Sequence, residues 1–425
     1  MLKREDNELI TRVGPGTPMG NLMREYWVPA MLSSELAQAD SDPVRVMLLG
    51  EQLIGFRDSN GHVGLVANNC PHRGASLFFG RNEEAGLRCV YHGWKFDTSG
   101  ACLDMPNEPA ESDFRTKVKA VAYPCQERGG IVWTYMGPRH DPPPLPDLEA
   151  NMAENATATA FQLEGNWLQI LEGDIDTTHV GFLHYGGLSA DDQPKGTFSE
   201  YQLRQKPAHF EVIDTPGGVA YGARRPGPPG EYYWRTAQFC MPFYTFTPPG
   251  VLGIKKNNGA RVPMDDTHTM HLWYTAYVPP QGYKVAAHLL DKVYTYDVPY
   301  LDKNGDYILD NVDAQDMMAW ITQGAIADRT QENLGASDNG IALFRRVLRR
   351  EIKKVEQGVD PMYTFRDPAQ NVRIDLPNEA DKHHNSDGAR SWIMRIHAAH
   401  SPIAEDVCQM YDANKPSPKS LRVVG

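Results

Sequence analysis

Short apolar runs, separated by turn-forming residues, dominate the chain from about residue 43 to residue 135. The runs VRVMLLG, QLIGFRD, HVGLVAN and GIVWTYMG are rich in branched or aromatic side chains, with Gly, Asn and Asp between them. Short strands joined by tight turns produce this pattern. It predicts a small β-sandwich, preceded by a turn-rich lead-in over residues 1–40 that contains GPGTPMG.

A proline-rich segment, PRHDPPPLPDLEAN (Pro138–Asn151), interrupts the pattern. Four of its residues between 142 and 146 are proline, which blocks regular structure and stiffens a linker. We therefore expect two domains. The first covers the N-terminal segment and the β-sandwich over residues 1–145, and the second covers residues 146–425.

The pattern beyond the linker mixes helical and strand-like segments. We expect a helix from Asn166 to about His184, with Asn166 as its N-cap, and further helices near 313–327 and 339–357. Strand-like runs lie between them, namely FEVID, GVAYGARR, YYWRTAQFCMPFYTF and HTMHLWYTAYVP. This order predicts an α+β fold in which a strongly curved antiparallel sheet wraps a long helix.

Composition is that of a globular protein. The 425 residues are 41% hydrophobic and 23% charged, which suits two or three packed domains. The formal net charge of −12 disfavours nucleic acid as a partner, because binding phosphates needs clustered Lys and Arg. There is no apolar run of about 18 residues, and MLKREDNELI lacks the apolar stretch of a signal peptide. We expect a cytoplasmic protein that binds no membrane.

Two cysteines and two histidines form the first candidate metal site. Cys70 and His72 are followed, after sixteen residues, by Cys89 and His92. Such a set can hold one [2Fe–2S] cluster, with the cysteines on one iron and the histidines on the other. A zinc knuckle is the alternative, but zinc sites usually space their first pair by two to four residues, and Cys-x-His has one.

Residues around this motif suit a cluster held by two loops. Gly74 and Gly93 would let the loops approach closely, and Trp94 and Phe96 could shield one side from water. Six cysteines are too few for a disulfide scaffold. The other four are expected to be buried free thiols: Cys102, Cys125, Cys240 and Cys408.

The segment from Glu172 to His184 contains the second candidate site. Its histidines and carboxylates suggest the 2-His-1-carboxylate triad of non-haem Fe(II), which leaves positions open for O₂ and substrate. Asp176 and His179 are three residues apart and would share a helix face. His179 and His184 are five apart, which turns them about 140° from each other on a regular helix. The helix must therefore distort or end between them, and Gly181 offers a place for that.

The third ligand must come from another element. The best source is the predicted helix with Asp313, Asp316, Trp320 and Gln323, whose spacing also fits a simple amphipathic helix. The residues alone leave Asp313 and Asp316 open.

Three segments together resemble the Rieske non-haem iron ring-hydroxylating oxygenases, nearly over the full length. They are CPHRGA with CVYHGWKFD, ILEGDIDTTHVGFLH, and QDMMAWITQG (Gln315–Gly324). The resemblance implies a Rieske [2Fe–2S] β-sandwich domain followed by a helix-grip (START-like) catalytic domain. It also implies one cluster and one mononuclear Fe(II) per chain, and it assigns Asp316 to the metal.

Two further segments resemble the phthalate dioxygenase branch, whose oxygenases consist of α subunits only and include enzymes for phenoxybenzoate and chlorobenzoate. They are GPGTPMG with REYWVPA, and ITQGAIADRTQENLGASDNGI. The resemblance implies a trimer or a hexamer of stacked trimers, and a reductase carrying FMN and a plant-type [2Fe–2S] centre. It places the cluster of one subunit beside the iron of its neighbour, with Asp176 bridging a cluster histidine and His179.

The branch favours anionic aromatic acids, and a carboxylate in an apolar pocket calls for Arg. Arg235 is the leading candidate, because it lies within the aromatic run YYWRTAQFCMPFYTF, and Arg204 is the second. The other arginines on the predicted pocket sheet are Arg224 and Arg225. The expected substrate is phthalate or isophthalate, oxidised with O₂ to a cis-dihydrodiol, and substituted benzoates come next.

Two alternative functions remain open on the residues. Monooxygenation or O-demethylation would use the same iron sites. A non-catalytic Rieske electron carrier would need only one domain of about 100 residues, so most of the chain would be unexplained.

Overall fold

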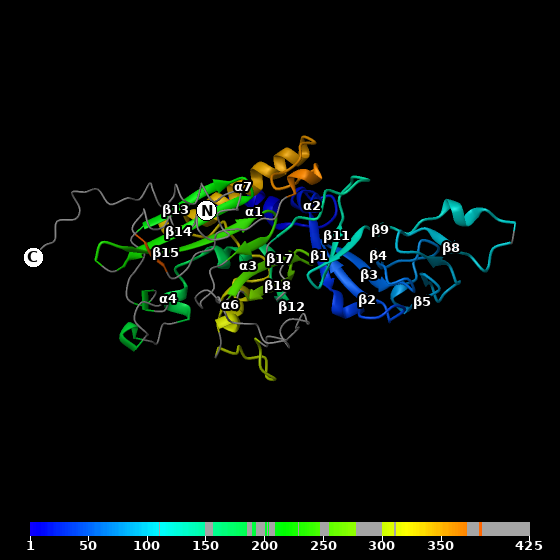
Figure 1. Ribbon diagram of the computed structural model, residues 1–425, viewed down its shortest axis with the longest axis horizontal. Helices are drawn as coiled ribbons and strands as arrows, with labels where there is room; N and C mark the ends of the chain where they lie inside the picture. The colour runs from blue at the N-terminus through cyan, green and yellow to red at the C-terminus, as the bar shows by residue number, and fades with distance from the viewer. Residues whose placement is uncertain are drawn as a thin grey trace, which may run out of the picture.

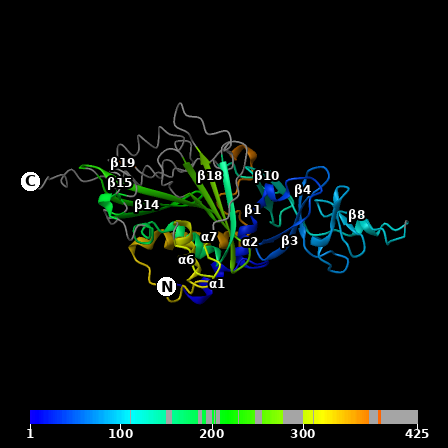
Figure 2. The same cartoon turned by 90° about the horizontal axis from the view of Figure 1, so that it is seen from below.

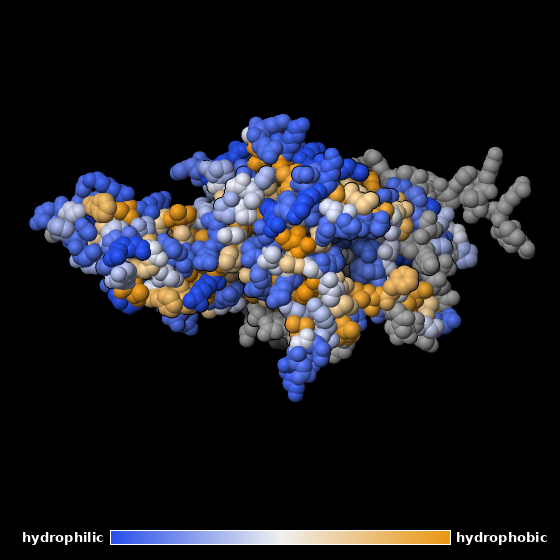
Figure 3. Space-filling view, turned by 180° about the vertical axis from the view of Figure 1, so that it is seen from behind, coloured by the Kyte–Doolittle hydropathy of each residue, from blue (hydrophilic) through white to orange (hydrophobic). Residues whose placement is uncertain are grey.

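The computed structural model shows an elongated molecule with a narrow β-rich end and a broader end built on one large sheet (Figures 1 and 2). It describes residues 1–109, 111–148, 156–184, 189–192, 200–201, 203, 209–227, 229–246, 255–277, 300–309, 312–371 and 382–384. The narrow end also stands out in the space-filling view, where hydrophilic and hydrophobic residues mix on its surface (Figure 3). The prediction of a β-sandwich followed by an α+β domain is confirmed.

Two small antiparallel sheets make up the narrow end. One has the order β2-β3-β4-β9 and the other the order β5-β6-β7-β8. Its elements are β2 (Val44–Leu48), β3 (Glu51–Arg57), β4 (Val63–Ala67), η2 (Leu77–Phe79), β5 (Arg81–Glu83), β6 (Gly86–Arg88), β7 (Lys95–Phe96), β8 (Cys102–Asp104), η3 (Phe114–Lys117) and β9 (Ala122–Tyr123). A separate core holds the sheets together and includes Ile54, Phe56, Leu87, Trp94 and Phe96.

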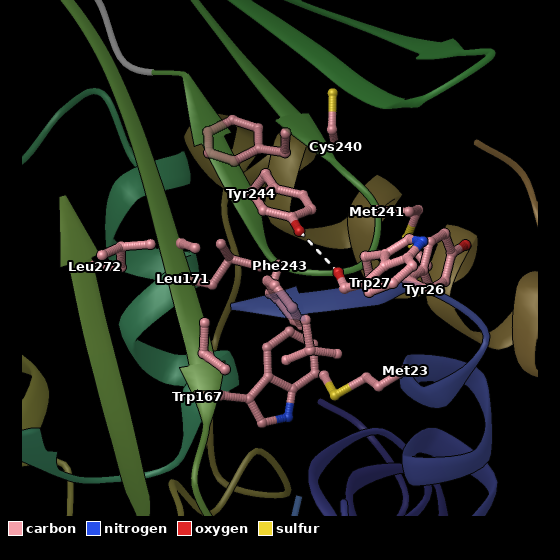
Figure 4. Packing of buried hydrophobic residues seen from close by; sticks show 14 of the residues in the cluster. Met23, Tyr26, Trp27, Trp167, Leu171, Cys240, Met241, Phe243, Tyr244 and Leu272 are labelled. Carbon is pink, nitrogen blue, oxygen red and sulfur yellow. Dashed lines mark hydrogen bonds between the residues drawn. The ribbon is translucent and has the colours of Figure 1, made fainter. Parts of the chain in front are cut away.

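The N-terminal lead-in packs with both the large sheet and the narrow end. Its elements, with the strands that join it, are α1 (Arg4–Thr11), α2 (Pro18–Arg24), β1 (Trp27–Leu32), η1 (Ser33–Leu36), β10 (Cys125–Arg128) and β11 (Ile131–Tyr135). Figure 4 shows Met23 and Trp27 packed with Trp167, Phe243 and Tyr244 of the broader end. The Tyr244 hydroxyl donates to the Trp27 carbonyl at 3.1 Å. The predicted boundary between the two domains at residue 145 remains a prediction.

The broader end is built on a sheet with the order β12-β18-β17-β16-β15-β14-β13, with β19 paired to β15. Helix α7 packs on β13 and β14, α3 packs on β15 to β17, and α6 packs on α3 and β12. The strands are β12 (Ala156–Glu164), β13 (His209–Thr215), β14 (Gly218–Pro226), β15 (Tyr232–Cys240), β16 (Tyr244–Phe246), β17 (Lys255–Pro263), β18 (His268–Tyr277) and β19 (Lys382–His384). The helices are α3 (Trp167–Ile175), α4 (Val180–Leu183), η5 (Ala190–Asp192), α6 (Val312–Ile321), η7 (Ala336–Asp338), α7 (Asn339–Glu356) and η8 (Pro368–Gln370).

Several predicted bounds are wrong, and the largest error concerns the helix expected to run from Asn166 to His184. Asn166 does cap α3, since its side chain accepts the N–H of Leu168, but the helix ends at Ile175 and a separate short helix follows. The aromatic run after Tyr232 is two strands, β15 and β16, and β12 and β17 were not predicted. Within the described ranges, no helix is both long and apolar enough to cross a membrane.

Candidate metal centres

Two tight loops present the Cys-x-His and Cys-x-x-His motifs. Cys70 follows β4 and Cys89 follows β6, and both cysteines are buried. The Gly74 N–H donates to the Cys70 carbonyl and the Gly93 N–H to the Cys89 carbonyl. Both glycines have positive φ, and a Cβ on Gly93 would lie 2.6 Å from Pro106. The loops therefore need glycine at these positions.

The two histidines of these loops lie side by side. The rings of His72 and His92 have centroids 4.5 Å apart, and the Trp94 indole stacks on His72 at 4.2 Å. Burial is the main cause that raises the pKa of Cys70 to about 11, and the adjacent Cys89 contributes to this rise. Burial also lowers the pKa of His92, which favours a neutral ring. Paired thiols beside paired imidazoles are the donor set of a Rieske cluster.

A compact triad of side chains forms the second centre. Ligand atoms of His179, His184 and Asp316 all lie within 4.8 Å of one another, and they form the one such group among the described residues. Asp316 Oδ1 is 3.5 Å from His179 Nε2 and 3.4 Å from His184 Nε2. Two imidazoles and one carboxylate converging on one point fit a mononuclear Fe(II). The side chain of the other candidate, Asp313, lies outside what the structure describes.

Asp176 explains how the two histidines meet. It adopts an extended backbone at the end of α3, and its Oδ1 accepts the Thr178 N–H at 2.7 Å and the Thr178 hydroxyl at 2.8 Å. Its Oδ2 accepts the His179 N–H at 3.1 Å. These bonds hold the chain in a turn between α3 and α4, so His179 and His184 flank the single turn of α4. The predicted break at Gly181 is wrong, because Gly181 lies inside α4.

Each imidazole has a polar partner on its Nδ1. His179 Nδ1 lies 3.3 Å from Asp176 Oδ2, and His184 Nδ1 lies 3.0 Å from Gln315 Oε1. Burial raises the pKa of Asp176, but the hydrogen bonds from His179 and Thr178 outweigh it and hold that pKa at about 2. Burial lowers the pKa of His179, but the Asp176 and Asp316 carboxylates raise it above its ordinary value.

Two buried arginines face the same region from the sheet. The register pairs Ala223 with Arg235, so Arg225, two residues along β14, shares that face. Among the described residues, Nε and Nη1 of both arginines are buried without a hydrogen-bond partner, and Arg225 Nη2 donates to the Thr177 carbonyl at 3.4 Å. Burial lowers the pKa of Arg235 and lowers that of Arg225 to about 10.

The remaining predicted residues have mixed outcomes. Arg204 lies outside the described residues. Arg224 belongs to the opposite face of the sheet, where its guanidinium lies 4.5 Å from the Tyr232 ring. The three other described cysteines are free thiols, but Cys240 alone is buried, while Cys102 and Cys125 are partly buried. Cys408 lies outside the described residues.

Sequence reasoning missed two residues of the site. Thr178 carries a readable signal, because Asp followed two residues later by Thr is a common helix-capping pattern. Gln315 carries none, since its partner His184 is 131 residues away in the sequence.

Family models match both parts of the chain. The Rieske [2Fe–2S] domain matches residues 26–124, and a domain described as LigXa C-terminal domain like matches residues 134–289 and 291–374.

Relatives of known activity align with large parts of the chain. The 3-chlorobenzoate-3,4-dioxygenase oxygenase subunit of Comamonas testosteroni is 48% identical over 64% of this chain and 63% of its own length. The 5,5'-dehydrodivanillate O-demethylase oxygenase subunit of a Sphingobium species is 36% identical over 89% of this chain and 87% of its own. The phthalate 4,5-dioxygenase oxygenase subunit of Pseudomonas putida is 37% identical over 82% of this chain and 85% of its own length. Against the chlorobenzoate relative, the chain thus spans just under two thirds of that protein's length.

Solved structures share the fold. The Pseudomonas putida CBB5 NdmA QL mutant with theobromine aligns at a TM-score of 0.58 with 19% identity, covering 83% of this chain and 94% of that one. Dicamba monooxygenase bound to dicamba aligns at a TM-score of 0.55 with 19% identity, covering 79% of this chain and 98% of that one.

These findings decide the class of the protein and its cofactors. The chain is an enzyme with one Rieske [2Fe–2S] cluster and one mononuclear iron, so a zinc knuckle and a plain electron carrier are excluded. Oxygenases of this kind draw electrons from reductase or ferredoxin partners and form oligomers. The chain belongs to the Rieske non-haem iron oxygenases, as the oxygenase α subunit of a ring-hydroxylating or O-demethylating system.

Proposed function

We propose that the protein dihydroxylates the ring of an aromatic carboxylate, most favourably phthalate or isophthalate, to a cis-dihydrodiol. The observation that carries the proposal is the pair of buried guanidinium groups of Arg225 and Arg235 near Asp176, whose Nε and Nη1 atoms have no hydrogen-bond partner within the described part of the chain. A buried cation without an acceptor costs free energy, and an anionic substrate would remove that cost.

Arg235 is the residue proposed to hold the substrate carboxylate. Its charge acts on both Asp176 and His179, so it lies close to the candidate iron site. A guanidinium can clamp a carboxylate through two parallel hydrogen bonds, which fixes the orientation of the ring. Arg225, two residues along the neighbouring strand, offers a second cation to a dicarboxylate. We propose no role for Arg204 beyond that of a second candidate.

His179, His184 and Asp316 are proposed to hold the ferrous iron, which supplies oxygen activation when bound. A 2-His-1-carboxylate ligand set leaves coordination positions of the iron open for O₂ and substrate. Asp176 orients His179 through Nδ1, and such a carboxylate partner strengthens an imidazole as a ligand.

Electrons are proposed to cross between subunits. In Figures 1 and 2 the loops of the Rieske end lie far from α6 of the same chain, which supports a route from the cluster of a neighbouring chain. Cys70, His72, Cys89 and His92 would hold that cluster. Asp176 already accepts two hydrogen bonds on Oδ1, so a neighbour's cluster histidine would take the place of the Thr178 hydroxyl there.

The assembly and the electron donor follow from the same proposal. A trimer, or a hexamer of two stacked trimers, would bring each cluster to a neighbouring iron. The donor would be a reductase with FMN and a plant-type [2Fe–2S] centre.

A substituted benzoate is the second candidate substrate, because the 3-chlorobenzoate relative has 48% identity. O-demethylation is the third, because the dehydrodivanillate relative aligns over 89% of the chain. Turnover with a surrogate reductase, run on phthalate, isophthalate, 3-chlorobenzoate and an O-methylated aromatic acid, separates the three. With isotopically labelled O₂, a dihydrodiol carries two labelled oxygens and a ring-monohydroxylated product carries one. An O-demethylated phenol keeps its original oxygen, and the label leaves with the methyl group as formaldehyde.

Arg235→Ala tests the carboxylate site. We expect KM for the dicarboxylate to rise by about tenfold or more, because a charged hydrogen bond contributes roughly 1.5–3 kcal/mol, while iron content stays unchanged. Arg224→Ala is the matched control, since Arg224 belongs to the other face of the same sheet. An unchanged KM in Arg235→Ala would remove this residue from the substrate site.

A further inference from the structure

The ring of His184 is held on the side away from Asp316 by an amide. His184 Nδ1 lies 3.0 Å from Gln315 Oε1, while His184 Nε2 lies 3.4 Å from Asp316 Oδ1. Gln315 immediately precedes Asp316 on α6, so one helix supplies both a candidate ligand and the residue that orients another candidate ligand.

The orientation of the Gln315 amide is determined by its second hydrogen bond. Gln315 Nε2 donates to the Leu309 carbonyl at 2.8 Å, and a carbonyl can only accept. Oε1 is therefore the atom that faces His184, and it can only accept as well. The proton of the neutral imidazole must then sit on Nδ1, which leaves the Nε2 lone pair directed at the metal position.

The two imidazoles differ in the charge of their partners. His179 faces the carboxylate of Asp176, whereas His184 faces the neutral amide of Gln315. Asp316 and Asp176 together carry two negative charges, which balance one divalent cation. A neutral partner on His184 orients that ring without adding a further carboxylate to Asp176 and Asp316, which face the two histidines.

We infer that Gln315 is a positioning residue that fixes the tautomer of His184 and keeps the charge of the metal site balanced. The inference rests on the proposed function, because it takes His184 as a ligand. It assigns a role to a residue that contacts neither the metal position nor the substrate.

Co²⁺ titration of protein that has lost its mononuclear metal but retains its cluster tests this role. In Gln315→Leu, which removes the Oε1 acceptor that faces His184 Nδ1, the dissociation constant for Co²⁺ should rise about 10–100-fold. Gln323→Leu is the matched control, because Gln323 is an exposed glutamine two residues beyond the end of α6, and its side chain donates to the Ala319 carbonyl. Its Co²⁺ affinity should equal that of the unaltered protein.

The proton NMR spectrum of the Co²⁺ form adds a readout that a merely structural role would not change. The unaltered protein should show two strongly shifted, exchangeable ring N–H signals, one from each histidine. Gln315→Leu should lose the signal of His184 to fast exchange with water. Unchanged Co²⁺ affinity together with both N–H signals in this variant would overturn the inference.

Two further variants keep the outcomes distinct. Gln315→Glu keeps an acceptor for the His184 N–H but adds a negative charge. It should retain both the Co²⁺ affinity and the N–H signal of His184, while phthalate binding weakens several-fold. Loss of the Co²⁺ affinity and of the signal in this variant would overturn the inference, even if Gln315→Leu does not fold. His184→Ala tests the proposed metal site itself. If it binds Co²⁺ normally, the proposed site fails, whereas weak binding by His184→Ala beside normal binding by Gln315→Leu defeats only the role of Gln315.

Discussion

At the scale of single residues, the candidate iron site depends on short hydrogen bonds that helical periodicity does not reveal. The spacing of His179 and His184 predicted a distorted helix, but the distortion comes from the side chain of Asp176, which caps the next turn. Side-chain bonds of Asp to nearby backbone N–H groups compete with helix formation. The types of ligand could therefore be predicted from the sequence, while the position of the break could not.

Asp176→Asn tests the proposed bridging role at this scale. We expect both metals to remain bound at saturating iron and turnover to fall by about 10–100-fold, because an amide cannot serve as an anionic partner for His179. Metal analysis should find three irons per chain, and product formation with a surrogate reductase measures the coupled turnover. Thr178→Val is the control, since it removes one hydrogen bond to Asp176 Oδ1 and keeps the charge. Normal coupled turnover in Asp176→Asn would rule out the bridge.

At the scale of elements, strands with aromatic and branched residues were predicted and polar ones were not. The strand β17 reads KKNNGARVP, which has neither alternation nor an apolar run, and it forms because β16 and β18 flank it. The close approach of α3 and α6 was also beyond prediction. It depends on Gly173, where a Cβ would lie 1.8 Å from Trp320 Nε1.

Gly173→Ala should separate these two helices. Trp320 lies one turn after Asp316 on α6, so moving the indole would carry Asp316 away from His179. We expect weakened binding of the mononuclear iron and a loss of about 1–3 kcal/mol in the free energy of unfolding, with the visible spectrum of the cluster unchanged. Gly335→Ala is the control, because its nearest atom would be 3.8 Å away. Full iron content in Gly173→Ala would show that the helices tolerate the methyl group.

At the scale of the whole molecule, motifs predicted both metal centres and the order of the domains, but not how distant segments are tied together. Glu172 on α3 accepts from Arg329 at 2.9 Å and from Arg345 on α7 at 2.6 Å, and Arg329 also donates to Asn7 on α1. Glu172 lies in the same iron motif as His179, yet nothing in its spacing distinguishes a buried ion pair from a ligand. Only tertiary contacts decide between the two.

Glu172→Gln should destabilise the broader end by about 3–5 kcal/mol at pH 7, because it removes the carboxylate that the buried Arg329 and Arg345 share and leaves only Arg345 with another one, that of Glu332. Burial raises the pKa of Glu172, but Arg329 and Arg345 outweigh that effect and hold it below its ordinary value. A carboxylate with a lowered folded-state pKa stabilises the fold above its unfolded pKa of about 4.3, and this stabilisation is lost as pH falls through the lower folded-state pKa. The difference in the free energy of unfolding between the unaltered protein and the variant should therefore shrink as the pH is lowered from 7 to 3. Urea unfolding followed by tryptophan fluorescence measures it. Glu356→Gln, on an exposed position of α7, should show no such difference at any pH. If the difference in the free energy of unfolding stays constant down to pH 3, the charge of Glu172 does not stabilise the fold.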